Sequence, residues 1–356
     1  MAHRLVSAIC IPALIAACTS TPPNPPPLAD DAGHPSGQSD AGANDGDAGH
    51  EPVDAGTLDN DGGTPATDGG AVTDAGTPAQ VHFIAIGDTG KGNANQQKVA
   101  DAMAAWCQVK TCDFVVMLGD NIYPSGVSSP DDPQFQTKFE DVYQALNIPF
   151  WVVLGNHDYG ANGLGLDFAK GQHEVDYTQL SFKWTMPAKY YRHTEGPAEF
   201  FALDTNMALF SFASQQKQDV SKWIADSTAP WKIAVGHHPY LSNGPHGNAG
   251  DYDGIPIPPA DGSAVKSFSE DVWCGKVDLY LSGHDHTRQW LTGTCNGTQL
   301  IVSGTGAEGT ELKGKNPVYF QTVNVGFVYI SIEGNALTAD FVDADGNVEF
   351  TRTFTK

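Results

Sequence analysis

The chain has 356 residues, 42 of them Asp or Glu and 19 Lys or Arg, which gives a formal net charge of −23. Such an acidic chain lacks the basic surface that nucleic-acid binding requires, so we expect no nucleic-acid partner. The composition is 40% hydrophobic and 10% aromatic, enough for a sizeable core. It contains no apolar run of about 18 residues, which excludes a membrane-embedded bundle.

The first 18 residues predict an export signal. Arg4 precedes an apolar segment, 5–17, and the segment ends in Ile15-Ala16-Ala17-Cys18, which resembles a bacterial lipobox. The resemblance implies that 1–18 is a lipoprotein-type signal peptide and that a lipid on Cys18 anchors the chain at the bacterial outer membrane or cell surface. The alternative is an ordinary signal peptide and a soluble periplasmic or secreted protein.

Residues 19–79 predict a disordered linker rich in Asp, Gly, Ala and Pro. The segment contains eleven acidic residues and no Lys or Arg, and it repeats Asp-Ala-Gly five times. With almost no large apolar side chains, it cannot bury enough surface to offset the entropy lost on ordering. The remainder, 80–356, is predicted to be a single folded domain.

From residue 81 onward, apolar strand-like runs alternate with helical segments. Strands are predicted near 81–87, 113–119, 149–155, 198–204, 231–236, 277–283, 298–304, 326–332, 336–341 and 348–354, and helices near 94–109, 134–147, 214–227 and 263–273. Alternating strands and helices indicate parallel pairing, and the strand-rich tail adds antiparallel strands. The predicted fold class is therefore α/β (α+β), a two-sheet mixed β-sandwich flanked by helices.

Five of these strands end in a glycine that is followed at once by residues able to bind a metal. The motifs are Gly87-Asp88-Thr89-Gly90, Gly119-Asp120-Asn121-Ile122-Tyr123, Gly155-Asn156-His157-Asp158, Gly236-His237-His238-Pro239 and Gly283-His284-Asp285-His286. A single Gly-Asp after a strand is usually only a turn. Because ligands gather at the carboxyl ends of strands in α/β sheets, all five loops are expected to converge.

This order of motifs resembles the calcineurin-like metallophosphoesterases, and among them the purple acid phosphatases of the small, mammalian-like, tartrate-resistant type. The family pattern is GDxG, GDxxY, GNH[DE], a strand ending in His, and GHxH. The resemblance implies that 80–356 is a catalytic domain, a binuclear-metal acid phosphatase that hydrolyses phosphate monoesters by attack of a metal-bound hydroxide. Small phosphate esters are the implied substrates, and we expect a monomer.

The resemblance also implies the metal ligands, residue by residue. Fe(III) would be bound by Asp88, Asp120, Tyr123 and His286, and a divalent ion (Fe, Zn or Mn) by Asn156, His237 and His284, with Asp120 bridging. Most metallophosphoesterases carry Asp-x-His in the first motif. This sequence has no His there, and Tyr123 supplies a hard anionic oxygen that suits trivalent iron. His238, expected to be a wall of the pocket, could exchange roles with His237.

Two unliganded histidines complete the implied catalytic set. His246 is assigned as the general acid that protonates the leaving group and His157 as the residue that positions the phosphate, although their order is not fixed by the sequence. One alternative function is a phosphodiesterase or nucleotidase with two divalent metals on the same fold. The other is a surface-binding lipoprotein without catalysis.

Four cysteines lie in the predicted domain: Cys107, Cys112, Cys274 and Cys295. An even number in an exported domain predicts two disulfides, and of three possible connectivities we expect the two local pairs. Cys295 precedes Asn296-Gly297-Thr298, which fits both a glycosylation sequon and a two-residue hairpin turn; we expect the turn.

Overall fold

The computed structural model describes residues 79–356. The predicted signal peptide, 1–18, the predicted lipid-bearing Cys18 and the predicted linker, 19–79 except for Ala79, lie outside the described residues. None of the helices between residues 79 and 356 combines the length and the apolar run that crossing a bilayer requires.

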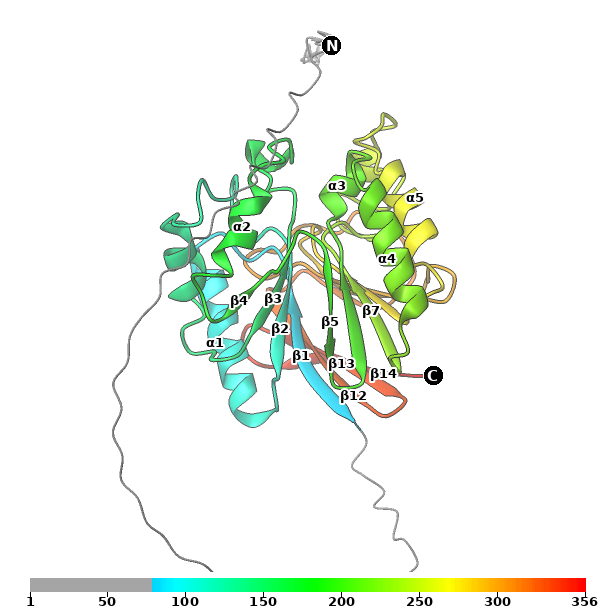
Figure 1. Ribbon diagram of the computed structural model, residues 1–356. Coiled ribbons are helices and arrows are strands. Elements are labelled where there is room, and N and C mark those ends of the chain that lie inside the picture. The colour runs from blue at the N-terminus through cyan, green and yellow to red at the C-terminus, as the bar shows by residue number, and fades with distance from the viewer. Residues whose placement is uncertain (1–78) are drawn as a thin grey trace, which may run out of the picture. The chain divides into compact units, whose positions relative to one another are not determined.

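Two seven-stranded sheets form the centre of the domain (Figure 1). In the first sheet the order is β14-β13-β12-β1-β2-β3-β4. Strands β1 to β4 are parallel, and β12 to β14 extend the sheet antiparallel beside β1. The strands are β1 (Gln80–Ile86), β2 (Phe114–Leu118), β3 (Phe150–Val153), β4 (Trp184–Thr185), β12 (Gly326–Glu333), β13 (Ala336–Asp343) and β14 (Val348–Thr355).

The second sheet has the order β11-β9-β10-β8-β7-β6-β5. Strands β6, β7, β8 and β10 are parallel, and β5, β9 and β11 pair antiparallel at the two sides. The strands are β5 (Tyr191–Glu195), β6 (Ala198–Ala202), β7 (Trp231–Val235), β8 (Leu279–Ser282), β9 (Arg288–Leu291), β10 (Gln299–Ser303) and β11 (Val318–Thr322). The predicted two-sheet mixed sandwich is confirmed.

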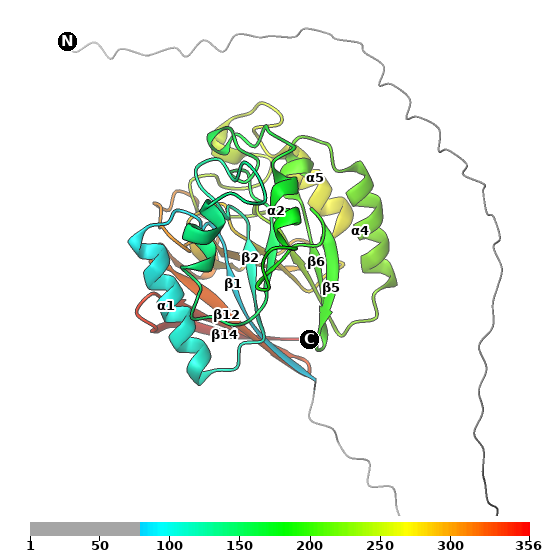
Figure 2. The same ribbon diagram turned by 60° about the vertical axis from the view of Figure 1, so that its left-hand side comes forward.

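Helices cover the outer faces of the sandwich (Figures 1 and 2). Helices α1 and α2 lie beside the first sheet, and α3, α4 and α5 beside the second. They are α1 (Ala94–Val109), α2 (Gly171–Tyr177), α3 (Thr205–Leu209), α4 (Ser214–Asp226) and α5 (Ser263–Val272), with short helical turns η1 (Gln136–Glu140), η2 (Ala161–Gly163) and η3 (Tyr252–Gly254).

The inner strands of the second sheet, β6 to β10, are buried on both faces, as their continuous apolar sequences require, whereas the edge strands β5 and β11 are partly exposed. Within β6, Phe200 points into the core between the sheets, and its neighbour Phe201 packs with the apolar residues of α4 and α5. The same alternation continues in β7 and β8, where Ala234 and Tyr280 face the helices. Apolar side chains therefore pack both between the two sheets and between the second sheet and its helices, and this packing fixes the strand ends that carry the motifs.

Three of the four predicted helices correspond to α1, α4 and α5, but the helix predicted at 134–147 is helical only over 134–140 and is mostly of another type. This segment forms the π-helical turn η1 followed by turns. The Gln96 side chain donates to the Lys138 carbonyl at 2.8 Å, and the Asp141 amide bonds the Gln136 carbonyl five residues earlier. This wider turn still buries Phe139. Helices α2 and α3 were not predicted.

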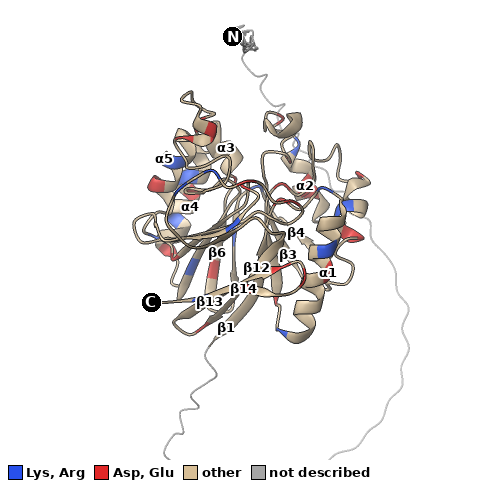
Figure 3. Cartoon of the chain, turned by 180° about the vertical axis from the view of Figure 1, so that it is seen from behind, with Lys and Arg blue, Asp and Glu red and all other residues tan. Residues whose placement is uncertain are grey.

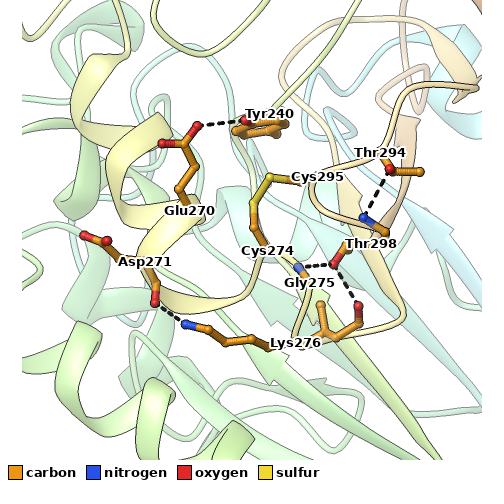
Figure 4. The surroundings of a disulfide bond; sticks show 11 residues. Tyr240, Glu270, Asp271, Cys274, Gly275, Lys276, Thr294, Cys295 and Thr298 are labelled. Atoms are coloured by element: carbon orange, nitrogen blue, oxygen red, sulfur yellow. Dashed lines mark hydrogen bonds between the residues drawn. A yellow bond between two sulfur atoms is a disulfide. The ribbon is translucent and has the colours of Figure 1, made fainter.

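Both predicted disulfides are present, Cys107–Cys112 and Cys274–Cys295. Figure 4 shows the second one, which joins the end of α5 to the hairpin before β10. In this hairpin Asn296 and Gly297 both have positive φ, 53° and 102°. That is the backbone of the predicted two-residue turn. The Thr298 hydroxyl, which the sequon would use, is buried and donates to the Val277 carbonyl.

Charged residues of both signs are interspersed on the domain surface (Figure 3). On α4, for example, Lys217 and Lys222 alternate with Asp219 and Asp226. Lys222 pairs with Asp226 one turn later, and Lys217 pairs with Asp271 of α5. Exposed pairs of this kind stabilise a fold only weakly, so the helices are held mainly by their apolar faces.

Candidate metal centre

All five motif loops meet at one end of the sandwich, because each follows the carboxyl end of a parallel strand, β1, β2, β3, β7 or β8. Hydrogen bonds to backbone carbonyls join the two sheets at this end. The Gly87 amide donates to the Ser303 carbonyl at 2.7 Å, and the Ser303 hydroxyl donates to the Ala85 carbonyl at 2.8 Å. The motifs are therefore held by the ends of both sheets.

One group of side chains surrounds the hydroxyl of Tyr123, and we call it the tyrosine side. This oxygen lies 3.1 Å from Asp88 Oδ1, 2.9 Å from Asp120 Oδ2 and 3.0 Å from His286 Nε2. The imidazole of His286 is itself 3.5 Å from Asp88 Oδ1. Three oxygen donors and one nitrogen thus face a common point in a buried site.

A second group, the imidazole side, adjoins the first through Asp120. His237 Nε2 lies 2.8 Å from Asn156 Oδ1, 3.1 Å from His284 Nδ1 and 3.4 Å from Asp120 Oδ1. Asp120, His237 and His284 form a group whose ligand atoms all lie within 4.8 Å of one another. The seven ligand positions predicted from the sequence are thereby brought together in the predicted two sets, with Asp120 in both.

The donor atoms are oriented by bonds on their far sides. His237 Nδ1 lies 2.9 Å from the Leu118 carbonyl, and Asn156 donates its amide to the Gly163 carbonyl at 2.7 Å. These contacts leave His237 Nε2 and Asn156 Oδ1 facing the site. Such outer contacts fix the tautomer and direction of a metal ligand, so the imidazole side is preorganised.

Three of the predicted ligand residues have a left-handed backbone, with φ of 60° at Asp88, 54° at Asp120 and 68° at His284. This conformation is uncommon for residues with a side chain and costs about 1 kcal/mol or more each. Its occurrence at three donors of one site indicates that the loops are shaped by function. The neighbouring Gly155 has no room for a side chain, because a Cβ there would lie 2.2 Å from Asp120 Oδ1.

Two buried carboxylates, Asp158 and Asp285, support the loops without joining the donor set. Asp158 accepts backbone N–H groups from Gly155, Asn121 and Ile122 at 2.8–3.0 Å. Asp285 accepts the amide of His246 at 2.9 Å. They hold the motif loops in place.

The donor set fits metal cations. Burial and the carboxylates of Asp120 and Asp88 raise the pKa of the Tyr123 hydroxyl well above its ordinary value. Burial alone would keep His237 neutral, but Asp120 and Asp88 outweigh it and raise the pKa of His237 to about 9. Carboxylates, a phenol and imidazoles that crowd together in a buried place are the arrangement that a bound cation stabilises.

The two predicted catalytic histidines lie on opposite flanks of this centre. The His157 ring packs against the Tyr123 ring at 4.3 Å, with Nδ1 2.7 Å from the Pro124 carbonyl and Nε2 4.0 Å from Asp120. The His246 ring stacks on His284 at 4.1 Å. His157 therefore belongs to the tyrosine side and His246 to the imidazole side.

His238 does not take the place of His237. Its Nδ1 lies 2.8 Å from the Thr205 hydroxyl, and its ring packs 4.6 Å from the His284 ring. Burial and the neighbouring His237 keep its pKa well below the ordinary value, which favours a neutral ring. This supports the expectation that His238 is a wall of the site.

Three charged residues near the centre were not found from the sequence. Asp253 lies 3.1 Å from His246 Nδ1, Glu308 Oε2 lies 3.8 Å from His286 Nδ1, and Lys91 pairs with Glu308 while its ammonium lies 4.9 Å over the Tyr123 ring. Lys91 directly follows the first motif, which was a usable signal. Asp253 and Glu308 lie in loops whose sequence carries no such signal.

The fold and the paired donor groups define a binuclear, metal-dependent hydrolytic domain. The family model of the calcineurin-like phosphoesterases matches residues 81–288, and the chain belongs to that family. It is similar to purple acid phosphatase 4 of Arabidopsis thaliana, at 28% identity over 75% of this chain and 81% of the relative. Its identity to the human tartrate-resistant acid phosphatase type 5 is 27%, over 79% of this chain and 92% of the relative.

Solved structures share the fold. GAP50, described as the anchor in the inner membrane complex of Plasmodium, matches with a TM-score of 0.63 and 23% identity over 78% of this chain and 89% of that chain. The purple acid phosphatase PPD1 from yellow lupin seeds matches with a TM-score of 0.60 and 18% identity, over 78% of this chain and 54% of that chain. At these identities the likeness is one of fold.

Proposed function

We propose that this chain is an acid phosphatase that hydrolyses phosphate monoesters at a binuclear metal centre. The observation that carries the proposal is the convergence of seven donor side chains, in two sets that share Asp120, at the strand ends of a calcineurin-like phosphoesterase domain. The similarity to plant and animal purple acid phosphatases over most of the chain agrees with it.

The tyrosine side would hold one ion through Asp88, Asp120, Tyr123 and His286, and the imidazole side the other through Asn156, His237, His284 and Asp120. When bound, two such ions activate water and neutralise the charge of the phosphoryl group. Hard anionic donors on the tyrosine side favour Fe(III), and imidazole and amide donors favour a divalent ion, Fe, Zn or Mn.

His246 is proposed to protonate the leaving oxygen. With its Nδ1 bonded to the Asp253 carboxylate, its Nε2 is left to donate a proton to the ester oxygen as the P–O bond breaks. Asp253 orients the ring in the way that carboxylates orient catalytic imidazoles. His157, across the centre, is proposed to position the phosphate.

The alternatives are less well supported. A phosphodiesterase or nucleotidase with two divalent metals would not need the phenol of Tyr123, which lies about 3 Å from three other donors. A surface-binding protein without catalysis has a precedent in the fold, since GAP50 is described as an anchor. However, a non-catalytic chain has no need for seven donor side chains and three strained ligand positions.

The test is metal analysis and turnover of the protein purified in air. We expect about two metals per chain, a visible absorption band from the tyrosinate bound to iron, and faster hydrolysis of monoesters than of diesters, each followed by the release of its alcohol or phenol. Tyr123→Phe should abolish the band and leave the fold intact, as judged by circular dichroism. A colourless protein with two metals and preferred diester cleavage would favour the phosphodiesterase instead.

We also propose that the chain is exported and anchored by a lipid on Cys18, with 19–79 as a spacer and 80–356 as the catalytic domain. The apolar segment 5–17 and the lipobox-like end support this. So do the two disulfides, because disulfides persist in oxidising compartments. The lipid-free alternative is a soluble periplasmic or secreted enzyme. Mass spectrometry of the mature N-terminus separates the two.

A further inference from the structure

A cavity of about 340 Å³ opens beside the imidazole side of the metal centre. Asn156, His284 and His246 form its inner wall. The outer wall is apolar and comes from the turn after η2, the end of α3 and the loop after η3: Leu164, Leu166, Leu209, Phe210, Ile255 and Pro259. A mainly apolar cavity with a few polar groups at one end is the usual form of a small-molecule site.

Several of these apolar side chains are left open to water. Leu164 is 66% exposed, Leu166 52% and Ile255 41%, and all three face the same cavity. Aliphatic side chains that gather around a cavity next to reacting groups mark a surface that a ligand covers. Because His246 and His284 lie at the inner end, that ligand would reach the metal centre itself.

The charges around the cavity restrict what can enter it. Among the described residues that line this cavity, Asp253 is the one carboxylate, and none is Lys or Arg. Two lysines, Lys91 and Lys138, line a different cavity, which lies against Tyr123 and His157 on the tyrosine side. A second anionic group on the substrate would lose water in the apolar cavity and face Asp253, and the proposed proton donor there, His246, is already paired with Asp253.

We propose that the apolar cavity receives the organic part of the substrate, so that the enzyme selects phosphate monoesters of uncharged, mainly apolar alcohols or phenols. This inference rests on the proposed phosphatase function. It follows from the place of His246: the residue proposed to protonate the leaving oxygen lines this cavity, so the group attached to that oxygen lies there too. Diphosphates and polyphosphate esters are then poor substrates.

The inference is tested with n-alkyl phosphates from ethyl to hexyl. Their leaving groups have nearly the same acidity, so kcat/KM reports the fit of the chain and not its reactivity. A fully buried methylene contributes about 0.8 kcal/mol, or roughly fourfold. We expect kcat/KM to rise at least about tenfold from ethyl to hexyl phosphate, and a hexyl ester with a terminal carboxylate to lose this gain.

Leu166→Lys gives the matched variant. It should lower the hexyl-to-ethyl ratio of kcat/KM at least about fivefold and raise the turnover of the carboxylated ester relative to hexyl phosphate. The control is Leu180→Lys, because Leu180 is 57% exposed and lies outside the cavity lining; it should leave all ratios unchanged. If kcat/KM does not change along the alkyl series, or if Leu166→Lys changes kcat/KM equally for every ester, the proposed selectivity is wrong but the proposed phosphatase function is not affected. Absence of phosphate release from all esters overturns both.

Discussion

Imidazoles are buried in two regions of the domain, and the two environments are opposite. At the metal centre, His237 Nε2 faces Asp120, Asn156 and a second imidazole within 3.4 Å, and its Nδ1 is bonded to a carbonyl. In β5, His193 lies between the rings of Trp151, at 3.8 Å, and Phe200, at 4.9 Å. Neither nitrogen of His193 has a hydrogen-bond partner among residues 79–356.

The consequences for charge are opposite as well. Burial without a polar partner lowers the pKa of His193 to about 3, so this ring is neutral and packs as an apolar group between its aromatic neighbours. Around His237 the carboxylates attract positive charge in spite of burial. Burial alone therefore does not identify a functional histidine; the anionic and amide oxygens around the ring do.

The largest expected effect comes from removing a histidine of the first region. His237→Ala should lower kcat/KM for a phosphate monoester by about 10³-fold or more, since it removes a donor that orients the imidazole side. Metal content should fall from about two ions per chain toward one. His173→Ala, at a histidine outside both regions, is the control and should change neither quantity. Full activity of His237→Ala would remove His237 from the proposed ligand set.

The sequence predicted the convergence of the donor side chains because its information is local. Each donor lies in the loop directly after a strand, and the pairing of parallel strands places these loops at the same end of the sheets. Asp253 and Glu308 could not be predicted in this way, because they reach the site from irregular loops whose path depends on tertiary packing. For the same reason β5, the edge strand that carries His193, was missed: the burial of His193 depends in part on Trp151, which is distant in sequence.

The second region should determine stability in acid. The pKa of His193 is about 3 in the folded protein and 6.5 for the free side chain. As the pH decreases below 6.5, the unfolded chain is therefore protonated first, and the free energy of unfolding decreases. Between pH 6.5 and 4.5 the loss is about 2 kcal/mol for this group. His193→Phe should remove that loss and keep the stacking with Trp151 and Phe200.

Urea unfolding of the wild type and His193→Phe at pH 7 and pH 4.5 measures this effect. The difference in unfolding free energy between the two proteins should widen in acid, while activity at pH 7 stays the same. Tyr191→Phe, a change in the same strand that leaves the imidazole in place, should show no such widening. An equal difference at both pH values would mean that His193 is hydrated or partnered in solution.

The smallest effect is expected at His286, whose two ring nitrogens lie in different environments: one resembles that of His237 and the other that of His193. His286 faces Tyr123 and Asp88 through Nε2, but its buried Nδ1 has no hydrogen-bond partner among the described residues, and Glu308 lies 3.8 Å away. Outer partners of metal-binding histidines typically change metal affinity about 10–100-fold. Because 3.8 Å exceeds a hydrogen bond, Glu308→Gln should weaken metal binding on the tyrosine side by about tenfold or less.

Competition of the loaded protein with a chelator measures this change, with Glu311→Gln at an exposed position of the same loop as the control. An unchanged affinity would mean that His286 needs no partner at Nδ1 and that, like His193, its ring is held in place by packing. A loss well above 100-fold would mean that Glu308 closes onto His286 Nδ1 when metal binds. The Glu308 carboxylate would then help His286 to bind a metal, and His193 has no such partner among the described residues.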